Sequence, residues 1–322
     1  MPHAIPADAL KDLAVGIGIT AVLLAVPLLS PLLGFFATVC IPLPALYYRI
    51  KLGRKIGLMV PLCSSVLLVP IAGGANLELL IFFELILLGL LMGELLPWRL
   101  SVEKTILGTT GGTLAAGLIL LLCISAIQST GPQALLDNYV RQNLEFTLAV
   151  YKSAGMSAEN VQKVSQALDS IQFVLVRILP SMSVAAVLFL CWTTLLLARH
   201  LVQRNQLLDF HFGALNRWTA PDFLVWAVIG CGTMLLVPVQ AMKLIGLNGL
   251  LVLMTIYFFQ GIAVISYYFG KKKFPRPLRI MLYSLIALQQ LVLLAVVAVG
   301  FFDIWANFRK LESQPPISPR SE

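Results

Sequence analysis

The chain has 322 residues, of which 59% are hydrophobic and only 12% are charged, and its formal net charge is +8. A soluble globular domain usually carries about 25% charged residues, and it cannot hide so large an apolar fraction from water. These proportions exclude a soluble enzyme, a disordered chain, a fibre and a disulfide-stapled secreted domain. They predict a polytopic membrane protein whose partner is the lipid bilayer.

Nine stretches are long and apolar enough to cross a membrane, because a helix needs about 20 apolar residues to span a hydrocarbon core roughly 30 Å thick. The predicted spans are residues 13–29, 32–48, 56–75, 77–97, 105–128, 171–198, 223–242, 244–269 and 280–302. The expected fold is therefore an all-α transmembrane helix bundle that forms one membrane domain over residues 1–302. Only Ser30 and Pro31 separate the first two spans, and a re-entrant pair there would give eight or seven crossings.

The basic residues predict the orientation of the bundle. With nine spans, most of the 23 Lys and Arg residues fall in segments on the side that carries the amino terminus. Cytoplasmic loops are enriched in Lys and Arg, so the amino terminus is expected to be cytoplasmic. The excess positive charge is thereby assigned to topology, and not to nucleic acid or to an acidic ligand.

Residues 129–170 are the only sizeable segment outside the predicted spans. Leu136, Val140, Leu144 and Leu148 form an apolar stripe, and a second amphipathic helix can begin after Ser157. The pattern predicts an extracytoplasmic helical hairpin over residues 132–170, whose second helix can continue into the sixth span. It either lies on the bundle or the lipid headgroups, or it covers an outward-facing cavity.

Glu84 is the only ionisable residue in the middle third of a predicted span. A carboxylate at that depth costs at least a few kcal/mol, which makes it a candidate functional residue. Either it contacts a solute, a cation or a proton in a cavity, or it is a protonated acid that is hydrogen-bonded to a neighbouring helix.

Three glutamines also lie near the middle of predicted spans: Gln260, Gln289 and Gln290. Amides at this depth usually form hydrogen bonds between helices. If the last two spans bring them beside Glu84, they complete a ligand-binding site with it.

Small residues recur four positions apart and allow two helix backbones to approach closely. The pairs are Gly53 and Gly57, Gly89 and Gly93, Gly108 and Gly112, and Ala21 and Ala25. They predict packing within the bundle. A groove for a partner helix is the alternative, and it is best supported for Ala21 and Ala25 on the first span.

No catalytic motif is found, since the chain contains no HExxH, GxSxG or Walker sequence. The three histidines stand apart and no two of the five cysteines form a CxxC pair, so no metal site is expected. The sequence therefore predicts neither an enzyme nor a cofactor. Residues 303–322 are polar and end in a segment rich in Pro and Ser, which predicts a disordered tail.

Three features together resemble the YybS-like family of bacterial membrane proteins over residues 13–302. They are the stretch PLPALYYRIKLGRKIGLMVPLCSSVLLVPIAGG, the amphipathic hairpin, and the motif FGALNRWTAPDFLVWAVIG with Trp218, Pro221 and Trp226. The resemblance implies a location in the bacterial cytoplasmic (inner) membrane and no settled substrate.

The first six spans are more distantly similar to the substrate-binding S components of energy-coupling-factor vitamin transporters. In that family an Ala-x-x-x-Ala sequence on the first helix packs against the transmembrane coupling subunit, and Ala21 and Ala25 have this spacing. The resemblance implies a small-molecule solute and a membrane partner subunit. The chain departs from the family pattern because S components generally have six helices.

The sequence thus predicts solute binding or transport, with a cavity near Glu84 that opens outward beneath the hairpin. The alternative is a scaffold that does not transport and that organises envelope or cell-division partners through its Gly and Ala faces. A membrane enzyme that acts on lipid is a third interpretation, and it lacks a predicted acid–base pair.

Overall fold

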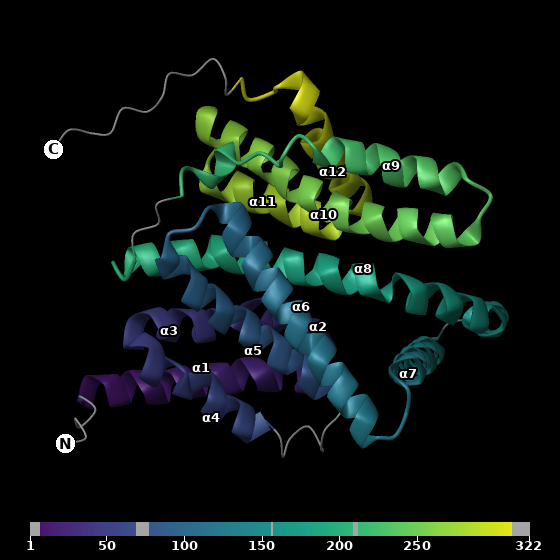
Figure 1. Ribbon diagram of the computed structural model, residues 1–322, viewed down its shortest axis with the longest axis horizontal. Helices are drawn as coiled ribbons and strands as arrows, with labels where there is room; N and C mark the ends of the chain where they lie inside the picture. Colours follow the sequence, from purple (N-terminus) through teal and green to yellow (C-terminus); the bar gives the residue numbers. More distant parts are fainter. Residues whose placement is uncertain (1–6, 69–76, 156, 209–211, 311–322) are drawn as a thin grey trace. The chain divides into compact units, whose positions relative to one another are not determined.

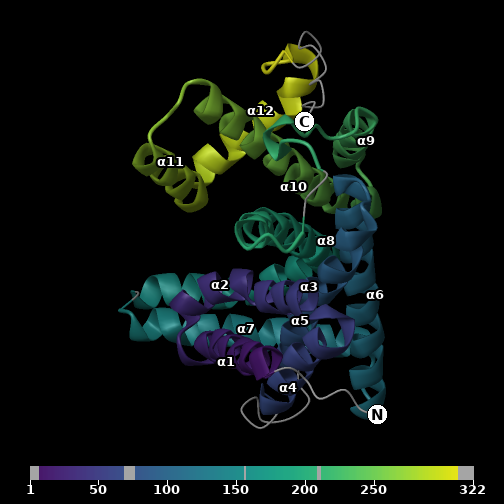
Figure 2. The same cartoon turned by 90° about the vertical axis from the view of Figure 1, so that its left-hand side faces the viewer.

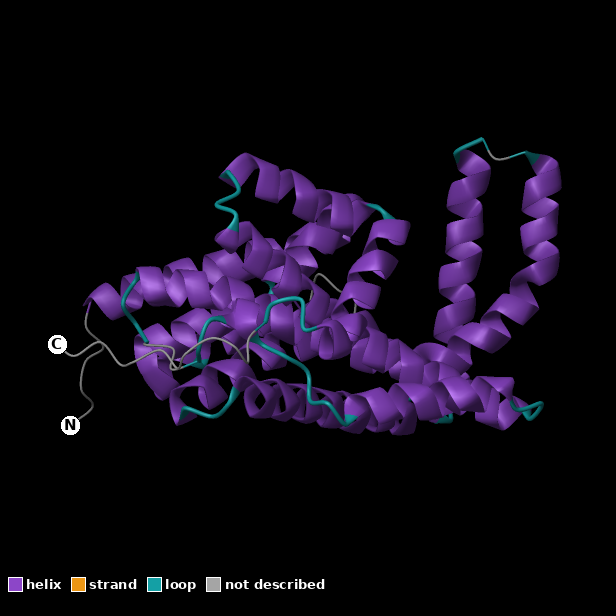
Figure 3. Cartoon of the chain, turned by 90° about the horizontal axis from the view of Figure 1, so that it is seen from above, coloured by secondary structure: helices purple, strands orange, loops and turns teal. Residues whose placement is uncertain are grey.

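The computed structural model describes residues 7–68, 77–155, 157–208 and 212–310, and all regular structure within these ranges is helical (Figures 1 and 3). The described residues divide into two compact units, with the boundary between His211 and Phe212. The single membrane domain over residues 1–302 stays a prediction, and the two units are described separately below.

The first unit contains the helices α1 to α8 and a short 3-10 helix, η1. They are α1 (Ala7–Leu29), α2 (Pro31–Cys40), α3 (Pro42–Gly57), α4 (Met59–Leu68), α5 (Leu77–Leu95), η1 (Leu96–Trp98), α6 (Val102–Ile127), α7 (Pro132–Ser153) and α8 (Ala158–Arg204). A proline begins α2, α3 and α7, where its missing N–H would have had no partner within the helix.

Helices α1 and α3 run in opposite directions. Near the start of α1, Lys51 Nζ donates a hydrogen bond of 2.7 Å to Asp12 Oδ1, which raises the pKa of the Lys51 ammonium group. One turn further along α1, Gly16 lies against the ring of Tyr48. The end of α3 and the start of α1 therefore share one end of this unit.

Helices α3 and α5 run in the same direction and approach closely. The backbone of Pro42 lies directly against Gly89, and the side chain of Arg49 lies against Gly93. At the end of this contact Arg49 Nε donates a hydrogen bond of 2.9 Å to Glu94 Oε2. The predicted packing role of Gly89 and Gly93 is confirmed, because a larger residue at either position would meet α3.

Helix α6 packs antiparallel against a different side of α5. Gly108 faces the end of the Leu95 side chain, and Gly112 faces that of Leu91. Packing within the bundle is thus confirmed for this pair of glycines too. The spacing of Gly53 and Gly57 has another cause, since Gly53 has φ = +77° and marks a kink inside α3.

Helices α7 and α8 form the predicted helical hairpin. Leu135, Val140 and Leu148 of α7 are buried, and Gln172 Nε2 of α8 donates a hydrogen bond of 3.3 Å to the Asp137 carbonyl.

Helix α8 continues through Pro180 for 47 residues, a length of about 70 Å at 1.5 Å per residue. That is more than twice the thickness of the hydrocarbon core. The hairpin projects beyond the other helices of the unit in Figure 3, and its position outside the cytoplasm stays a prediction.

The second unit contains a short 3-10 helix, η2, and four α-helices. They are η2 (Leu215–Arg217), α9 (Leu224–Leu236), α10 (Gln240–Lys271), α11 (Arg276–Leu288) and α12 (Gln290–Ala306). Helix α10 is the longest and packs against both α9 and α12. Figure 2 shows α11 leaving this group at a steep angle to α12.

Helices α10 and α12 cross in antiparallel orientation with their backbones in contact. An added Cβ at Gly261 would overlap the Val296 carbonyl oxygen, and one at Gly300 would overlap the Tyr257 carbonyl oxygen. The two glycines therefore set the distance between these helices.

Among the described residues, five helices are long and apolar enough to cross a membrane. They are Asp8–Leu29, Leu80–Trp98, Val102–Ile127, Glu159–Arg204 and Gln240–Lys271, and the pair α11 and α12 makes a sixth if it counts as one bent span. The expected nine spans are not confirmed.

The remaining predicted spans coincide with shorter or broken helices. Span 32–48 falls on α2 and α3, which are separated at Ile41, and span 223–242 falls on α9, which has 13 residues. Span 280–302 falls on α11 and α12, which are bent by 102°. Span 56–75 covers α4, which has 10 residues, and its last part lies outside the described residues.

The predicted tail also begins later than residue 303. Helix α12 continues to Ala306, and Asn307 ends it in the left-handed conformation with φ = +40°. Arg309 is buried. Residues 311–322 lie outside the described residues, so the predicted disorder of that segment stays a prediction.

Candidate functional site

Glu84 is the eighth residue of α5 and is half-buried. Its carboxyl group lies directly over Gly117 of α6, where an added Cβ would stand 2.7 Å from the Glu84 carboxyl carbon. Gly117 is buried. The absence of a side chain at residue 117 is therefore what makes room for the carboxyl group between the two helices.

The Glu84 carboxyl group has no hydrogen bond or ion pair to any of the described residues. One turn before Gly117 on α6, the side chain of Thr113 is 1% exposed, and its hydroxyl group likewise has no partner within the described part of the chain. The Glu84 carboxyl group at the contact of α5 with α6 and the nearby Thr113 hydroxyl group on α6 therefore both have unused hydrogen-bonding capacity.

Other threonines of α6 behave differently from Thr113. Thr105 and Thr109 donate hydrogen bonds of 3.0 and 2.8 Å to the carbonyl oxygens four residues earlier, those of the N-cap Ser101 and of Thr105. Thr110 donates to the Cys191 sulfur on α8, over 3.5 Å. A buried polar group without a partner is costly, so Thr113 and the half-buried Glu84 can each gain from a bound polar group. The hydroxyl group of Thr194 on α8 is also buried without a partner among the described residues.

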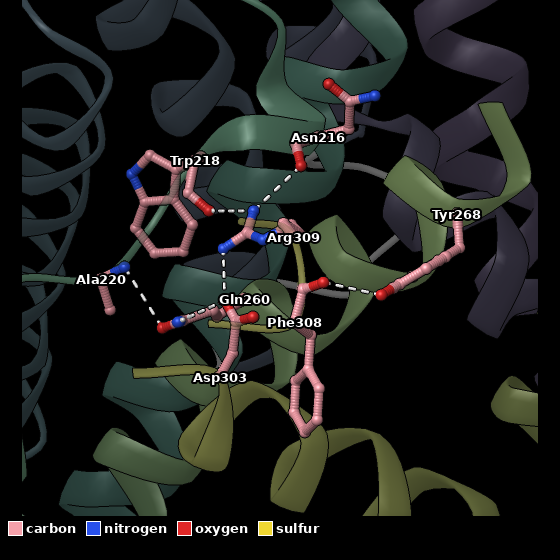
Figure 4. A network of polar contacts seen from close by, with 8 residues as sticks. All are labelled: Asn216, Trp218, Ala220, Gln260, Tyr268, Asp303, Phe308 and Arg309. Carbon is pink, nitrogen blue, oxygen red and sulfur yellow. Dashed lines mark hydrogen bonds and ion pairs between the residues drawn. The ribbon is translucent and has the colours of Figure 1, made fainter. Parts of the chain in front are cut away.

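Gln260 belongs to a polar network in the second unit (Figure 4). Its Oε1 accepts a hydrogen bond of 3.2 Å from the Ala220 N–H, and its Nε2 donates one of 3.3 Å to Asp303 Oδ2. Both ends of the amide therefore hold other parts of the unit together. This is the interhelical role that amides at mid-span usually have, while ligand binding by Gln260 stays a prediction.

Arg309 is at the centre of this network. Its Nη1 donates hydrogen bonds of 2.9 Å to the carbonyl oxygens of Asn216 and Trp218, and its Nη2 pairs with Asp303 Oδ2 at 2.6 Å. The side chains of Arg309 and Asp303 are 0% and 4% exposed. In this way Arg309, which follows α12, fixes the loop around η2. Tyr268 holds the segment after α12 in place, because it donates a hydrogen bond of 2.7 Å to the Phe308 carbonyl.

The residues of the Trp-Pro-Trp motif have different environments. Trp218 is half-buried and packs against a cluster formed around Ala220, Tyr257 and Val297. Pro221 is exposed, and Trp226 is 75% exposed near the start of α9. The structure thus explains Trp218 as an anchor of the η2 loop, while nothing in it explains Pro221 and Trp226.

The remaining predicted site residues are divided between the two units. Gln289 and Gln290 are exposed at the bend between α11 and α12, not within a continuous span. Ala21 and Ala25 are half-buried on α1. Glu84 belongs to the first unit and the three glutamines belong to the second, so a ligand site shared by all four stays a prediction.

No sequence pattern singles out Asp303 and Arg309, and both fall in the polar segment 303–322 that is predicted to be a disordered tail. The available signal was their opposite charge on either side of Asn307, a residue type that readily adopts the left-handed conformation at a helix end.

Comparison with known protein families gives a match over most of the chain. The family described as "Predicted membrane protein (DUF2232)" matches residues 18–304. No curated protein and no solved structure matches the chain. The match supports neither the predicted YybS-like name nor the predicted similarity to transporter S components. Since it covers most of the sequence and the structure provides several candidate spans, the chain is a multi-pass membrane protein that belongs to the DUF2232 family.

Proposed function

We propose that the first unit binds a small solute at Glu84, and that the protein is the solute-binding component of a membrane transporter. The observation that carries the proposal is the Glu84 carboxyl group, which lies within an apolar helix and has no partner among the described residues. An ionisable group in a span is costly, so such groups usually serve ions, protons or ligands. Thr113 supplies a second unused polar group one helical turn from the contact.

The order of helices in the first unit supports the similarity to S components. The described helices form six successive segments, namely α1, α2 with α3, α4, α5, α6 and α8, and α7 is additional. α3 is antiparallel to α1 and parallel to α5, and α6 is antiparallel to α5. Four of these segments, α1, α5, α6 and α8, are long and apolar enough to cross a membrane. The other two, α2 with α3 and α4, bring the number to the six helices that the resemblance implies, as a broken segment and a short one. Ala21 and Ala25 lie on the first of them and are the proposed contact for a coupling subunit.

The proposed location is the bacterial inner membrane, with the amino terminus in the cytoplasm. Arg49, Lys51 and Arg54 support this orientation, because they gather at the end of the unit where α1 begins and α5 ends. Basic residues are enriched at cytoplasmic membrane ends. The proposal includes no catalytic reaction and no cofactor.

The scaffold alternative has less support. It relies on exposed Gly and Ala faces, whereas Gly89, Gly93, Gly108 and Gly112 face neighbouring helices of their own unit. Gly53 lies at the kink of α3 and Gly57 lies against the backbone of its own helix, so of the four predicted pairs Ala21 and Ala25 remain for a partner helix.

Purification of the full chain from its native membranes in mild detergent tests the proposal. We expect mass spectrometry to find a small molecule released from the denatured wild-type protein. Glu84→Gln and Glu84→Leu should each retain no more than about a tenth of the solute that the wild type retains, because one lost charge-assisted hydrogen bond is worth about 1.5–3 kcal/mol. If both variants retain as much solute as the wild type, Glu84 does not bind it. Co-purification of an ATPase pair with a membrane subunit would support the S-component assignment, and their absence would contradict that assignment.

Two glycines of α6 provide a matched pair of variants. Gly117→Ala places a methyl group where the Glu84 carboxyl group lies, whereas Gly111→Ala adds one where nothing lies within 4 Å. We expect Gly117→Ala to lose bound solute and Gly111→Ala to keep it, with thermal melting used to confirm that both variants are folded. Equal retention by the two folded variants would contradict a binding site at the contact of α5 with α6.

A further inference from the structure

The corner between α10 and α11 concentrates positive charge. It carries Lys271, Lys272, Lys273, Arg276 and Arg279 in sequence order. The first four are exposed, and within the described ranges none of these four forms an ion pair with a carboxylate. Their charge is therefore available to an external anion.

Arg279 gives this corner a fixed shape. Its Nε donates a hydrogen bond of 2.8 Å to the Phe274 carbonyl, and its Nη2 donates one of 3.0 Å to the Phe269 carbonyl. Lys273 adopts the left-handed conformation with φ = +51°, which turns the chain from α10 into α11. The exposed basic side chains thus project from an ordered turn.

An open apolar cavity of about 280 Å³ lies beside the turn, between α10, α11 and α12. Its lining includes Phe269 from α10, Leu282 and Ile286 from α11, and Ala295 and Val296 from α12. All of its lining residues are apolar. Phe269 precedes Lys271 by two residues and its carbonyl is bound by Arg279, so the cavity begins directly beside the basic corner.

Helix α11 has the character of a helix that lies at a membrane surface. Its 13 residues are too few to cross a membrane, and it is bent by 102° from α12. Two arginines stand in its first turn, while Ile280, Met281, Leu285 and Leu288 are exposed further along. Such helices place charged residues among the lipid headgroups and apolar ones among the acyl chains.

From these four features we propose that the corner of α10 and α11 binds one anionic phospholipid. Lys271, Lys272, Lys273 and Arg276 hold its phosphate headgroup, and one acyl chain occupies the apolar cavity. Basic pockets between membrane helices commonly bind such headgroups. A group of basic residues without a pocket would indicate only which end of the helices faces the cytoplasm. The apolar cavity beside these basic residues is the observation that indicates a bound lipid. The site lies wholly in the second unit and goes beyond the solute site proposed for the first.

Lipid titration of the purified, delipidated full chain tests this site. The probes are phosphatidylglycerol and phosphatidylcholine with identical acyl chains, and native mass spectrometry counts the bound molecules. We expect one phosphatidylglycerol to bind at least tenfold more tightly than phosphatidylcholine, because each Lys or Arg near an anionic headgroup adds roughly a factor of five. Equal affinity for the two lipids would overturn the proposal.

A pair of double variants separates this site from general charge attraction. Lys272→Ala with Lys273→Ala is expected to weaken phosphatidylglycerol binding by about tenfold or more. Arg217→Ala with Lys243→Ala removes the same charge from exposed positions elsewhere in the unit and should leave the affinity unchanged. If both variants lose the same affinity, the lipid responds to net charge and the proposed site is wrong.

A second pair of variants tests the cavity. Ala295→Phe fills it, whereas Ala298→Phe adds the same ring at an exposed position of α12 that does not line it. We expect only Ala295→Phe to weaken phosphatidylglycerol binding severalfold. Unchanged binding by folded Ala295→Phe would show that no acyl chain enters the cavity and would overturn the proposal.

Discussion

Replacement of Arg309 by alanine is expected to reduce the free energy of unfolding of the second unit by about 3–5 kcal/mol, the usual cost of removing one member of a buried ion pair. The change leaves the buried Asp303 carboxyl group without its ion-pair partner. It also removes the hydrogen bonds to the Asn216 and Trp218 carbonyl groups, which hold the η2 loop. Denaturant unfolding of the protein in detergent, followed by tryptophan fluorescence, measures the loss.

Two further variants make this prediction specific. Arg217→Ala removes an exposed arginine from the same loop and is expected to change the free energy of unfolding by less than about 0.5 kcal/mol. Asp303→Leu combined with Arg309→Met replaces both charges by apolar groups, so the double variant should be more stable than Arg309→Ala. An Arg309→Ala variant as stable as the wild type would show that this network does not hold the loop.

Gly300→Ala is expected to destabilise the second unit by about 3 kcal/mol, at the upper end of the usual cost of overpacking. The new methyl group would overlap the Tyr257 carbonyl oxygen and approach the Gly261 nitrogen to 2.6 Å. These are backbone atoms, which a side-chain rotation cannot move away. The helices α10 and α12 must therefore separate, and thermal unfolding of the purified protein measures the effect.

The matched variant is Gly230→Ala on α9, where an added methyl group meets nothing within 4 Å. Alanine favours a helix over glycine by about 1 kcal/mol, so this variant should be as stable as the wild type or more stable. Gly300→Ala is thus expected to lower the melting temperature, whereas Gly230→Ala should leave it unchanged or raise it. A Gly300→Ala variant that melts at or above the wild-type temperature would contradict the close crossing.

The sequence predicted the long helices well, because uninterrupted apolar runs determine them. The predicted spans 77–97, 105–128 and 244–269 correspond to α5, α6 and α10 with ends that differ by a few residues. The amphipathic stripes likewise predicted the pair formed by α7 and α8. In these segments a single property, the burial of apolar side chains in lipid or against a neighbour, is enough to specify the helix.

The failures occur where the backbone breaks within an apolar run. Average hydropathy is the same for a straight and a bent helix, so spans 32–48 and 280–302 looked continuous. Pro42 could have indicated the first break, because a proline removes a helix donor. The second break, at Gln289, involves no proline, so the sequence carries no comparable signal for it.

The candidate sites were predicted in part for a similar reason. The position of Glu84 in an apolar helix was evident from the sequence, whereas its contact with Gly117 depends on the register of α5 against α6. The network of Asp303 and Arg309 depends on the left-handed conformation of Asn307, which ends α12 between the two residues. Contacts between residues that are far apart in the sequence leave no periodic pattern in it.

The two sets of glycine contacts on α5 have a mechanical consequence. Gly89 and Gly93 bring α5 against α3, and Gly112 and Gly117 receive α5 side chains on α6. A helix in such close contact on two sides can neither slide nor rotate without a collision, because packed interiors deform little. The three helices α3, α5 and α6 must then move as one rigid block. Any opening of the first unit that admits a solute has to come from movement of the helices outside this block, which are α1, α2, α4, α7 and α8.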